Sequence, residues 1–166
     1  MRSRKTLSIA GLGVLLAAVL WLSPGLRADG PGDSRKISAL LSDAQRAAIL
    51  ASWAAADMEQ YRFSTIRWES HTNKLTEIKE LVNTVARTVT KLNQRRSEAS
   101  PRQQQDMDRM TAALSEVVTN VEFTLGHLRE HQQDIETCVT TDPEYKGLLK
   151  TNSELATRLA ELKPSK

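Results

Sequence analysis

The sequence has little that interrupts a helix. Of its 166 residues only seven are glycine and five are proline, and between residues 34 and 163 just two of each occur. Aromatic residues make up 4% of the chain. Strands joined by tight turns normally use more of these residues, so the composition favours long helices over sheets.

Sequence patterns that mark common catalytic sites are also absent. The chain contains no G-x-S-x-G nucleophile turn, no Walker loop, no glycine-rich dinucleotide turn, no C-x-x-C and no C-x-x-C-H. Serine, histidine and aspartate occur, but nothing in their spacing arranges them as a catalytic set. We therefore expect that the protein is not an enzyme and has no cofactor, with zinc the one exception weighed below.

Cysteine is nearly missing, since Cys138 is the only one. No internal disulfide can form, but an unpaired cysteine in an exported protein can cross-link two chains. The alternative is a lone, half-buried thiol without a partner.

Residues 1–28 have the order of a secretion signal. Cations precede an apolar run over 7–22, a helix breaker follows at 24–25, and the small residue Ala28 stands before a cleavage site at Asp29. We expect cleavage and an exported, periplasmic or extracytoplasmic bacterial protein. The alternative is an uncleaved membrane anchor, although a membrane span needs about 20 apolar residues.

An excess of positive charge is missing from the remaining chain. The net charge of the whole sequence is +3, but four of its 23 Lys and Arg residues lie in 1–28, where no acid occurs. Residues 29–166 therefore carry 19 cations and 20 acids. Nucleic-acid binding needs clustered cations, so we expect no nucleic-acid partner.

Three apolar seams, meaning rows of apolar residues at steps of three and four, predict an all-α fold. We expect a tether over 29–41 and then a helix that begins at Ser42, where Ser42 and Gln45 form a capping box. This helix should bend or restart at 70–73. A second capping box, Ser100 with Gln103, begins the next helix, and Pro143 begins the last. The seams are Leu75, Ile78, Val82, Val85, Val89 and Leu92; Met107, Met110, Leu114, Val117, Val121, Thr124, Leu128, His131 and Ile135; and Tyr145, Leu148, Asn152, Leu155, Leu159 and Leu162.

Short connections between the seams predict antiparallel neighbours. We expect a single domain over 42–163, built as a long antiparallel helical hairpin with a third packing helix, which is a three-helix bundle of coiled-coil character. In the hairpin, Leu92 should lie opposite Met107 and Val85 opposite Leu114.

Polar residues interrupt all three seams at one expected level. His71 extends the first seam backward, His127 and His131 lie on the second, and Asn152 lies on the third. The first hypothesis is a structural polar layer that fixes register. A second is a zinc site at His71, His127 and His131, with Glu130 or Asp134 behind them. A third is a pH switch, and a fourth is that the histidines never meet.

The segment from His127 to His131 also fits H-x-x-E-H, the pattern of one class of zinc proteases. Leu128 is needed for the seam, so Glu130 should point outward. Only three positions of the pattern are fixed and those enzymes are much larger, so we do not predict a protease.

Two stretches of the sequence resemble known groups of helical proteins. Leu41-Ser42-Asp43-Ala44-Gln45 resembles the L-T-x-x-Q element of periplasmic helical chaperones of the Spy and CpxP type, and 99–103 resembles a degraded second copy. The stretch 68–131, with Tyr145, Asn152 and Ala156 after it, resembles a set of uncharacterised exported bacterial helical proteins. That second resemblance implies the same hairpin and no transferable activity.

Together these features predict an exported, non-enzymatic helical interaction protein that binds a protein partner or itself. The first alternative is a periplasmic chaperone-like or stress-responsive module that exposes an apolar face. The second is a metal-binding helical bundle that uses the three histidines. A membrane contact is expected only if residues 1–28 stay attached.

Overall fold

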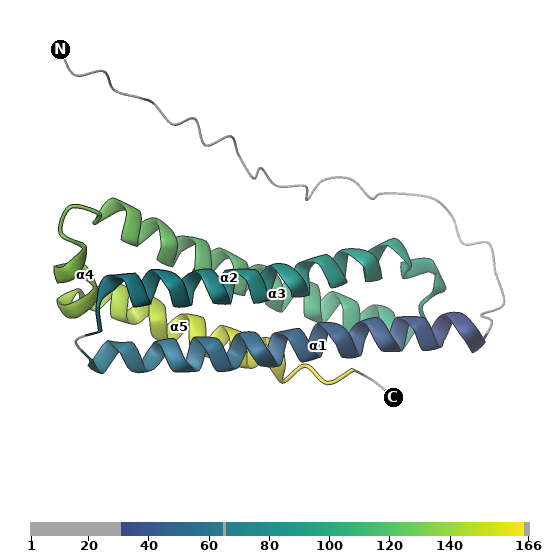
Figure 1. Ribbon diagram of the computed structural model, residues 1–166. Helices are drawn as coiled ribbons and strands as arrows, with labels where there is room; N and C mark the ends of the chain where they lie inside the picture. Colours follow the sequence, from purple (N-terminus) through teal and green to yellow (C-terminus); the bar gives the residue numbers. More distant parts are fainter. Residues whose placement is uncertain (1–30, 65, 165–166) are drawn as a thin grey trace, which may run out of the picture.

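The computed structural model describes residues 31–64 and 66–164, with side-chain burial from residue 34, and these residues form an all-α bundle (Figure 1). The predicted fold class is confirmed, since no strand occurs in the described ranges. The expected secretion signal over 1–28 lies outside them. No helix in the described part of the chain combines the length and apolar character that a membrane crossing demands.

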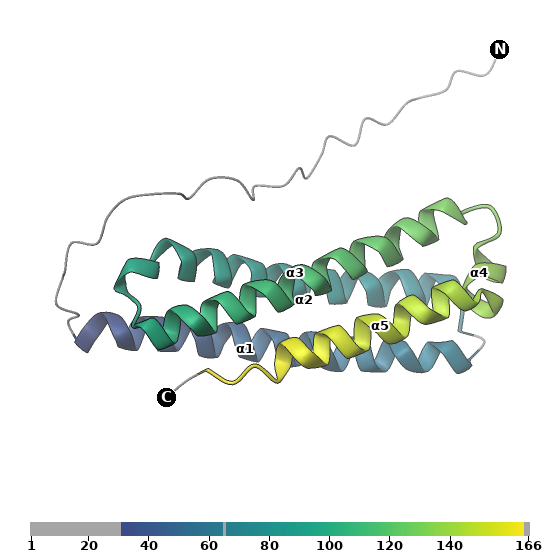
Figure 2. The ribbon, with the colours of Figure 1, turned by 180° about the vertical axis from the view of Figure 1, so that it is seen from behind.

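Four long helices alternate in direction. They are α1 (Pro31–Glu59), α2 (Trp68–Gln94), α3 (Pro101–Glu130) and α5 (Pro143–Ala160). Two short 3-10 helices, η1 (Gln60–Phe63) and η2 (Arg96–Glu98), lie in the first two turns, and a short α4 (Ile135–Thr141) precedes α5. Figure 2 shows α5 packed beside both α1 and α3. The α2 helix also packs on both α1 and α3. Both α2 and α5 therefore lie between α1 and α3, so α1 and α3 are diagonally opposite in the bundle.

The predicted hairpin of α2 and α3 is confirmed. Leu92 and Met107 lie in one buried cluster, and Val85 and Leu114 belong to the main core. The capping box is present too: the Ser100 hydroxyl accepts the N–H of Gln103 at 3.3 Å, and the Ser100 N–H donates to the Gln103 side chain at 2.9 Å.

The tether expected over 29–41 is wrong from Pro31 onward, because α1 begins there. Ile37 and Leu41 are fully buried in a cluster with Leu92 and Met107, so the start of α1 covers the tip of the α2–α3 hairpin. The Gln103 side-chain amide donates to the Ser34 carbonyl at 3.1 Å. Ser42 lies inside α1 and bonds the Ser38 carbonyl, so its predicted capping role is wrong.

The break in the first predicted helix lies earlier than 70–73. The chain leaves α1 at Glu59 and is extended at Ser64, with φ −128° and ψ 160°, and at Arg67, with φ −63° and ψ 147°. Two apolar segments that would form one long helix therefore fold back as α1 and α2 and bury their faces against each other. The bundle consequently has four long helices instead of the three that the seams predicted.

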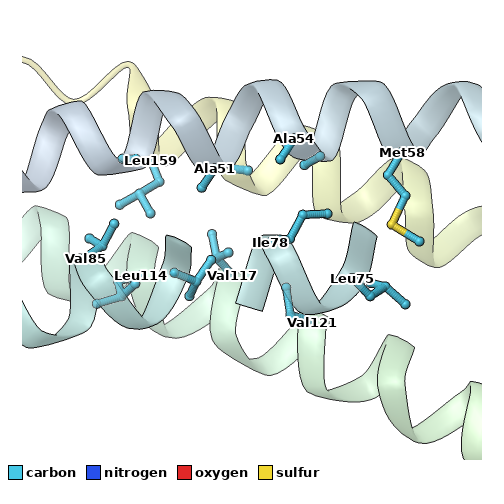
Figure 3. Close-up of a cluster of buried hydrophobic side chains, with 14 of the residues drawn as sticks. Ala51, Ala54, Met58, Leu75, Ile78, Val85, Leu114, Val117, Val121 and Leu159 are labelled. Carbon is cyan, nitrogen blue, oxygen red and sulfur yellow. The ribbon is translucent and has the colours of Figure 1, made fainter. Parts of the chain in front are cut away.

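Small side chains let α1 approach its neighbours closely. Its buried face is rich in alanine, whereas α2, α3 and α5 contribute larger aliphatic residues to the same core (Figure 3). The alanines are Ala44, Ala47, Ala48, Ala51, Ala54 and Ala55.

The helices differ in length. At about 1.5 Å per residue, the 18 residues of α5 span about 27 Å and the 30 residues of α3 span about 45 Å.

The turn between α3 and α5 also differs from the prediction. We expected the seam of α3 to continue through His131 to Ile135, but α3 ends at Glu130, His131 is its C-cap, and Ile135 begins α4. Asp142 then caps α5, because its carboxylate accepts the N–H of Glu144 at 2.8 Å and of Tyr145 at 3.4 Å. This cap was not predicted from the sequence.

Candidate functional site

One end of the bundle, which we call the histidine end, gathers the start of α2, the end of α3, α4 and the start of α5. It contains His71, His127 and His131 around the buried ring of Tyr145. The Tyr145 ring centroid lies 5.6 Å from that of His71 and 6.1 Å from that of His127, with which it is stacked. The expected convergence of the histidines is thus present, but an unpredicted tyrosine lies at its centre.

His71 occupies the buried side of this end. Its Nδ1 is hydrogen-bonded to the Tyr145 hydroxyl at 2.9 Å, and the Tyr61 ring packs edge-on at 5.1 Å. Burial lowers the pKa of His71, and a hydrogen bond with the Ile66 backbone offsets part of that effect. Burial also raises the pKa of Tyr145 well above its ordinary value. Both side chains are therefore neutral near neutral pH, as a buried structural pair should be.

His127 and His131 lie on the other side of Tyr145, nearer the surface. Their ring centroids are 4.6 Å apart, and His127 Nε2 lies 2.8 Å from Oδ2 of Asp142. Burial raises the pKa of Asp142, but the hydrogen bond from His127 and those from the backbone of Glu144 and Tyr145 outweigh it, so the net pKa is lowered. The carboxylate thus stays ionised beside the imidazole.

This second group has the composition of a metal site. One nitrogen of His127, one nitrogen of His131 and one oxygen of Asp142 all lie within 4.8 Å of one another. His71 is not a member of the group, so the structure brings together two of the three predicted ligands and adds Asp142. Asp134, which we expected behind the ligands, has its carboxylate 3.5 Å from Nδ1 of His131. Glu130 is exposed, as expected for a residue outside the seam.

Asn152 belongs to a separate polar contact. Its side-chain amide donates to the Thr124 hydroxyl at 2.8 Å, and that hydroxyl donates to the Asn120 carbonyl at 2.8 Å. Thr124 precedes His127 by three residues on α3, so Asn152 lies about one helical turn away from the level of the histidines. The shift arises because α3 ends early and the chain forms α4 before α5. The single predicted layer is therefore two, one at His71 and one at Asn152.

Cys138 lies inside the core, with 3% of its surface exposed. Burial raises the pKa of its thiol to about 11, and the charges of Asp142 and Asp134 add to that effect. The thiolate is the form that exchanges with disulfides, so this thiol is poorly suited to cross-linking two chains. The geometry agrees with the alternative, a lone cysteine packed in the interior.

A different feature of the surface is its large exposed apolar side chains. On α1, Trp53 is 63% exposed and Leu50, one turn earlier, is 44% exposed. On α3, Phe123 is 67% exposed beside a shallow, open depression whose lining includes Thr119 and Leu155. Tyr61 and Trp68 pack against the core, whereas Trp53 does not.

Comparisons of the chain with family models, with curated proteins and with solved structures gave no match. The two sequence resemblances consequently stay predictions. The features of the bundle that bear on function are its histidine end and its exposed apolar side chains.

Proposed function

We propose that this protein is an exported, non-enzymatic interaction protein that binds a partner protein through apolar side chains on the outside of its helical bundle. The observation that carries the proposal is the exposure of Trp53, at 63%, on the outer face of α1. Tryptophan is the residue type most enriched among side chains that dominate protein interfaces. Leu50 extends the same face, since residues three apart on a helix are neighbours.

Exposed apolar side chains on α3 support the same function. Because α1 and α3 are diagonal partners, their outward faces point to opposite sides of the bundle. Phe123 and Val118 are exposed on α3, at 67% and 37%. Single exposed apolar residues are common on protein surfaces, so Phe123 and Val118 contribute to the proposal as further side chains that a partner can contact.

The interior argues for interaction and against catalysis. Its main polar groups bond to one another, as His71 does with Tyr145 and Asn152 with Thr124, and aliphatic side chains fill the remaining space. The apolar seams that a chaperone-like module would offer to clients are buried in the core. Client binding would therefore have to use the outer side chains, and we retain that role only as the alternative.

Export is part of the proposal and rests on the order of features in residues 1–28. Mass spectrometry of the protein from its native cells tests it. A chain that begins at Asp29 and is found outside the cytoplasm supports export, whereas an intact cytoplasmic chain that begins at Met1 contradicts it.

Photo-cross-linking tests the binding surface. A benzophenone amino acid replaces Trp53 in the full chain, and a matched variant carries it at the exposed position of Glu80 on α2. After irradiation of the native cells, we expect a discrete protein adduct from position 53 and none from position 80. An adduct of twice the chain mass identifies a second copy as the partner. No adduct from position 53, or the same adduct from both positions, contradicts the proposal.

A further inference from the structure

We propose that His127, His131 and Asp142 form a binding site for one divalent transition-metal ion of the zinc type at the histidine end. The inference is independent of the protein-binding surface, because Trp53 lies on a different helix. It also replaces the zinc site predicted from sequence, in which His71 supplied the third nitrogen.

The donor atoms are already close to the geometry that zinc needs. Zinc bonds to histidine nitrogen and carboxylate oxygen are about 2.0–2.2 Å long, so tetrahedral donors lie about 3.3–3.6 Å apart. The His127 and Asp142 donors are 2.8 Å apart, and all three donors lie within 4.8 Å. A contraction of about 1 Å by one side chain, with a slight opening of the His127–Asp142 pair, completes the triangle.

His131 is the side chain able to make that adjustment. It is the C-cap of α3 instead of an internal helical residue, and 39% of its side chain is exposed. Its ring therefore has room to turn toward the other two donors. The same exposure leaves the fourth coordination position open to water, which is how zinc sites with three protein ligands are completed.

The other two ligands are held in place by the fold. Oδ1 of Asp142 accepts the backbone N–H groups of Glu144 and Tyr145, which leaves Oδ2 directed at His127. The stacked ring of Tyr145 fixes the plane of His127. Supporting contacts of this kind orient metal ligands, and their loss commonly weakens affinity 10–100-fold.

The chemistry of the donor atoms favours the same set. A carboxylate oxygen and two imidazole nitrogens are ligand types that zinc binds in proteins. Metal binding at Nε2 of His127 uses the neutral tautomer that carries its proton on Nδ1, so no proton remains between Nε2 and Oδ2 of Asp142. The hydrogen bond seen between the two side chains is thus the metal-free form of the same contact.

Calorimetric titration of the full chain with zinc chloride at pH 7.5 tests the inference, using protein without a polyhistidine tag. We expect one zinc ion per chain, and a melting temperature about 5–10 °C higher when zinc is 100-fold above its Kd. His131→Ala should weaken binding at least tenfold. Because His131 is a partly exposed cap residue, this variant should fold normally.

Two control variants separate this site from its rivals. Cys138→Ser removes the single thiol of the chain, and His71→Gln removes the histidine of the alternative site. Both variants should retain zinc affinity within about threefold. Absence of saturable binding up to 1 mM zinc overturns the inference. Equal affinity in His131→Ala and the parent, or loss of binding in either control, also overturns it.

Discussion

The hydroxyl of Tyr145 lies 2.9 Å from Nδ1 of His71, and this contact joins α5 to α2 inside the bundle. Both side chains are fully buried. The two residues are 74 positions apart in the chain, so the bond connects segments that only the complete bundle brings together. A neutral imidazole and a neutral phenol pair there without the cost of burying a charge.

Replacing Tyr145 with phenylalanine should destabilise the protein by about 1–3 kcal/mol, because the buried His71 nitrogen loses its hydrogen-bond partner. Urea unfolding followed by circular dichroism measures the loss. A double-mutant cycle with His71→Phe should give a coupling energy of about 1 kcal/mol or more, since neither group keeps its partner in the single variants. Additive effects would mean that the bond contributes nothing.

Acid should weaken the fold through His71. Burial lowers its pKa in the folded state, whereas in the unfolded chain it has the ordinary value near 6.5. As the pH falls below about 6.5, the unfolded state takes up this proton first, so stability is complete above that pH and declines toward the lowered folded pKa. His71→Gln cannot titrate, and its melting temperature should depend less on pH between 5 and 7. An unchanged pH slope would refute this role.

The buried Asn152–Thr124 pair should behave differently when one partner or both are removed. Thr124→Val leaves the Asn152 amide without its acceptor and should cost about 1–3 kcal/mol. The double variant Thr124→Val with Asn152→Leu should recover most of that loss. Thr119→Val, at an exposed position of the same helix, serves as the control and should change stability by less than about 0.5 kcal/mol.

Leu41 tests whether the start of α1 belongs to the folded bundle. It is 1% exposed, so Leu41→Ala should cost about 2–5 kcal/mol, the usual effect of emptying a packed leucine site. Leu50→Ala, on the same helix and 44% exposed, should cost well under half as much. Thermal unfolding compares the two. Equal, small effects would mean that residues before 42 are a tether after all.

Regular apolar spacing explains why the fold class and the α2–α3 hairpin were predictable. Leu92 with Met107 and Val85 with Leu114 followed from the spacing and from the cap at Ser100–Pro101. The start of α1 was not predictable from the sequence, because Gly32 and the charges near it resemble a linker. Ile37 and Leu41 become buried only when the start of α1 packs on the tip of the α2–α3 hairpin. Likewise, the reversal after Glu59 contains no proline or glycine to mark it.

The histidine end was half predictable for a related reason. His127 and His131 share a helical face whatever follows, so their pairing needed only local spacing. The roles of Asp142 and Tyr145 depend on the turn between α3 and α5. The seam predicted a longer α3. In that predicted arrangement the residues of α5 that face α3 were shifted by one helical turn, so Asn152 was expected beside the histidines. The only sequence signal for Asp142 was its position directly before Pro143, where a helix cap is expected.

The concentration dependence of unfolding tests the account most directly, because its central claim is that one chain closes its own apolar core and leaves only outer side chains for a partner. The urea midpoint of Trp53→Ser, which lacks the proposed contact, should stay constant over a 100-fold range of protein concentration, whether or not the parent protein associates with itself. A midpoint that rises with concentration in both proteins would show that the seams pair between chains, and it would contradict the closed bundle and the function proposed from it.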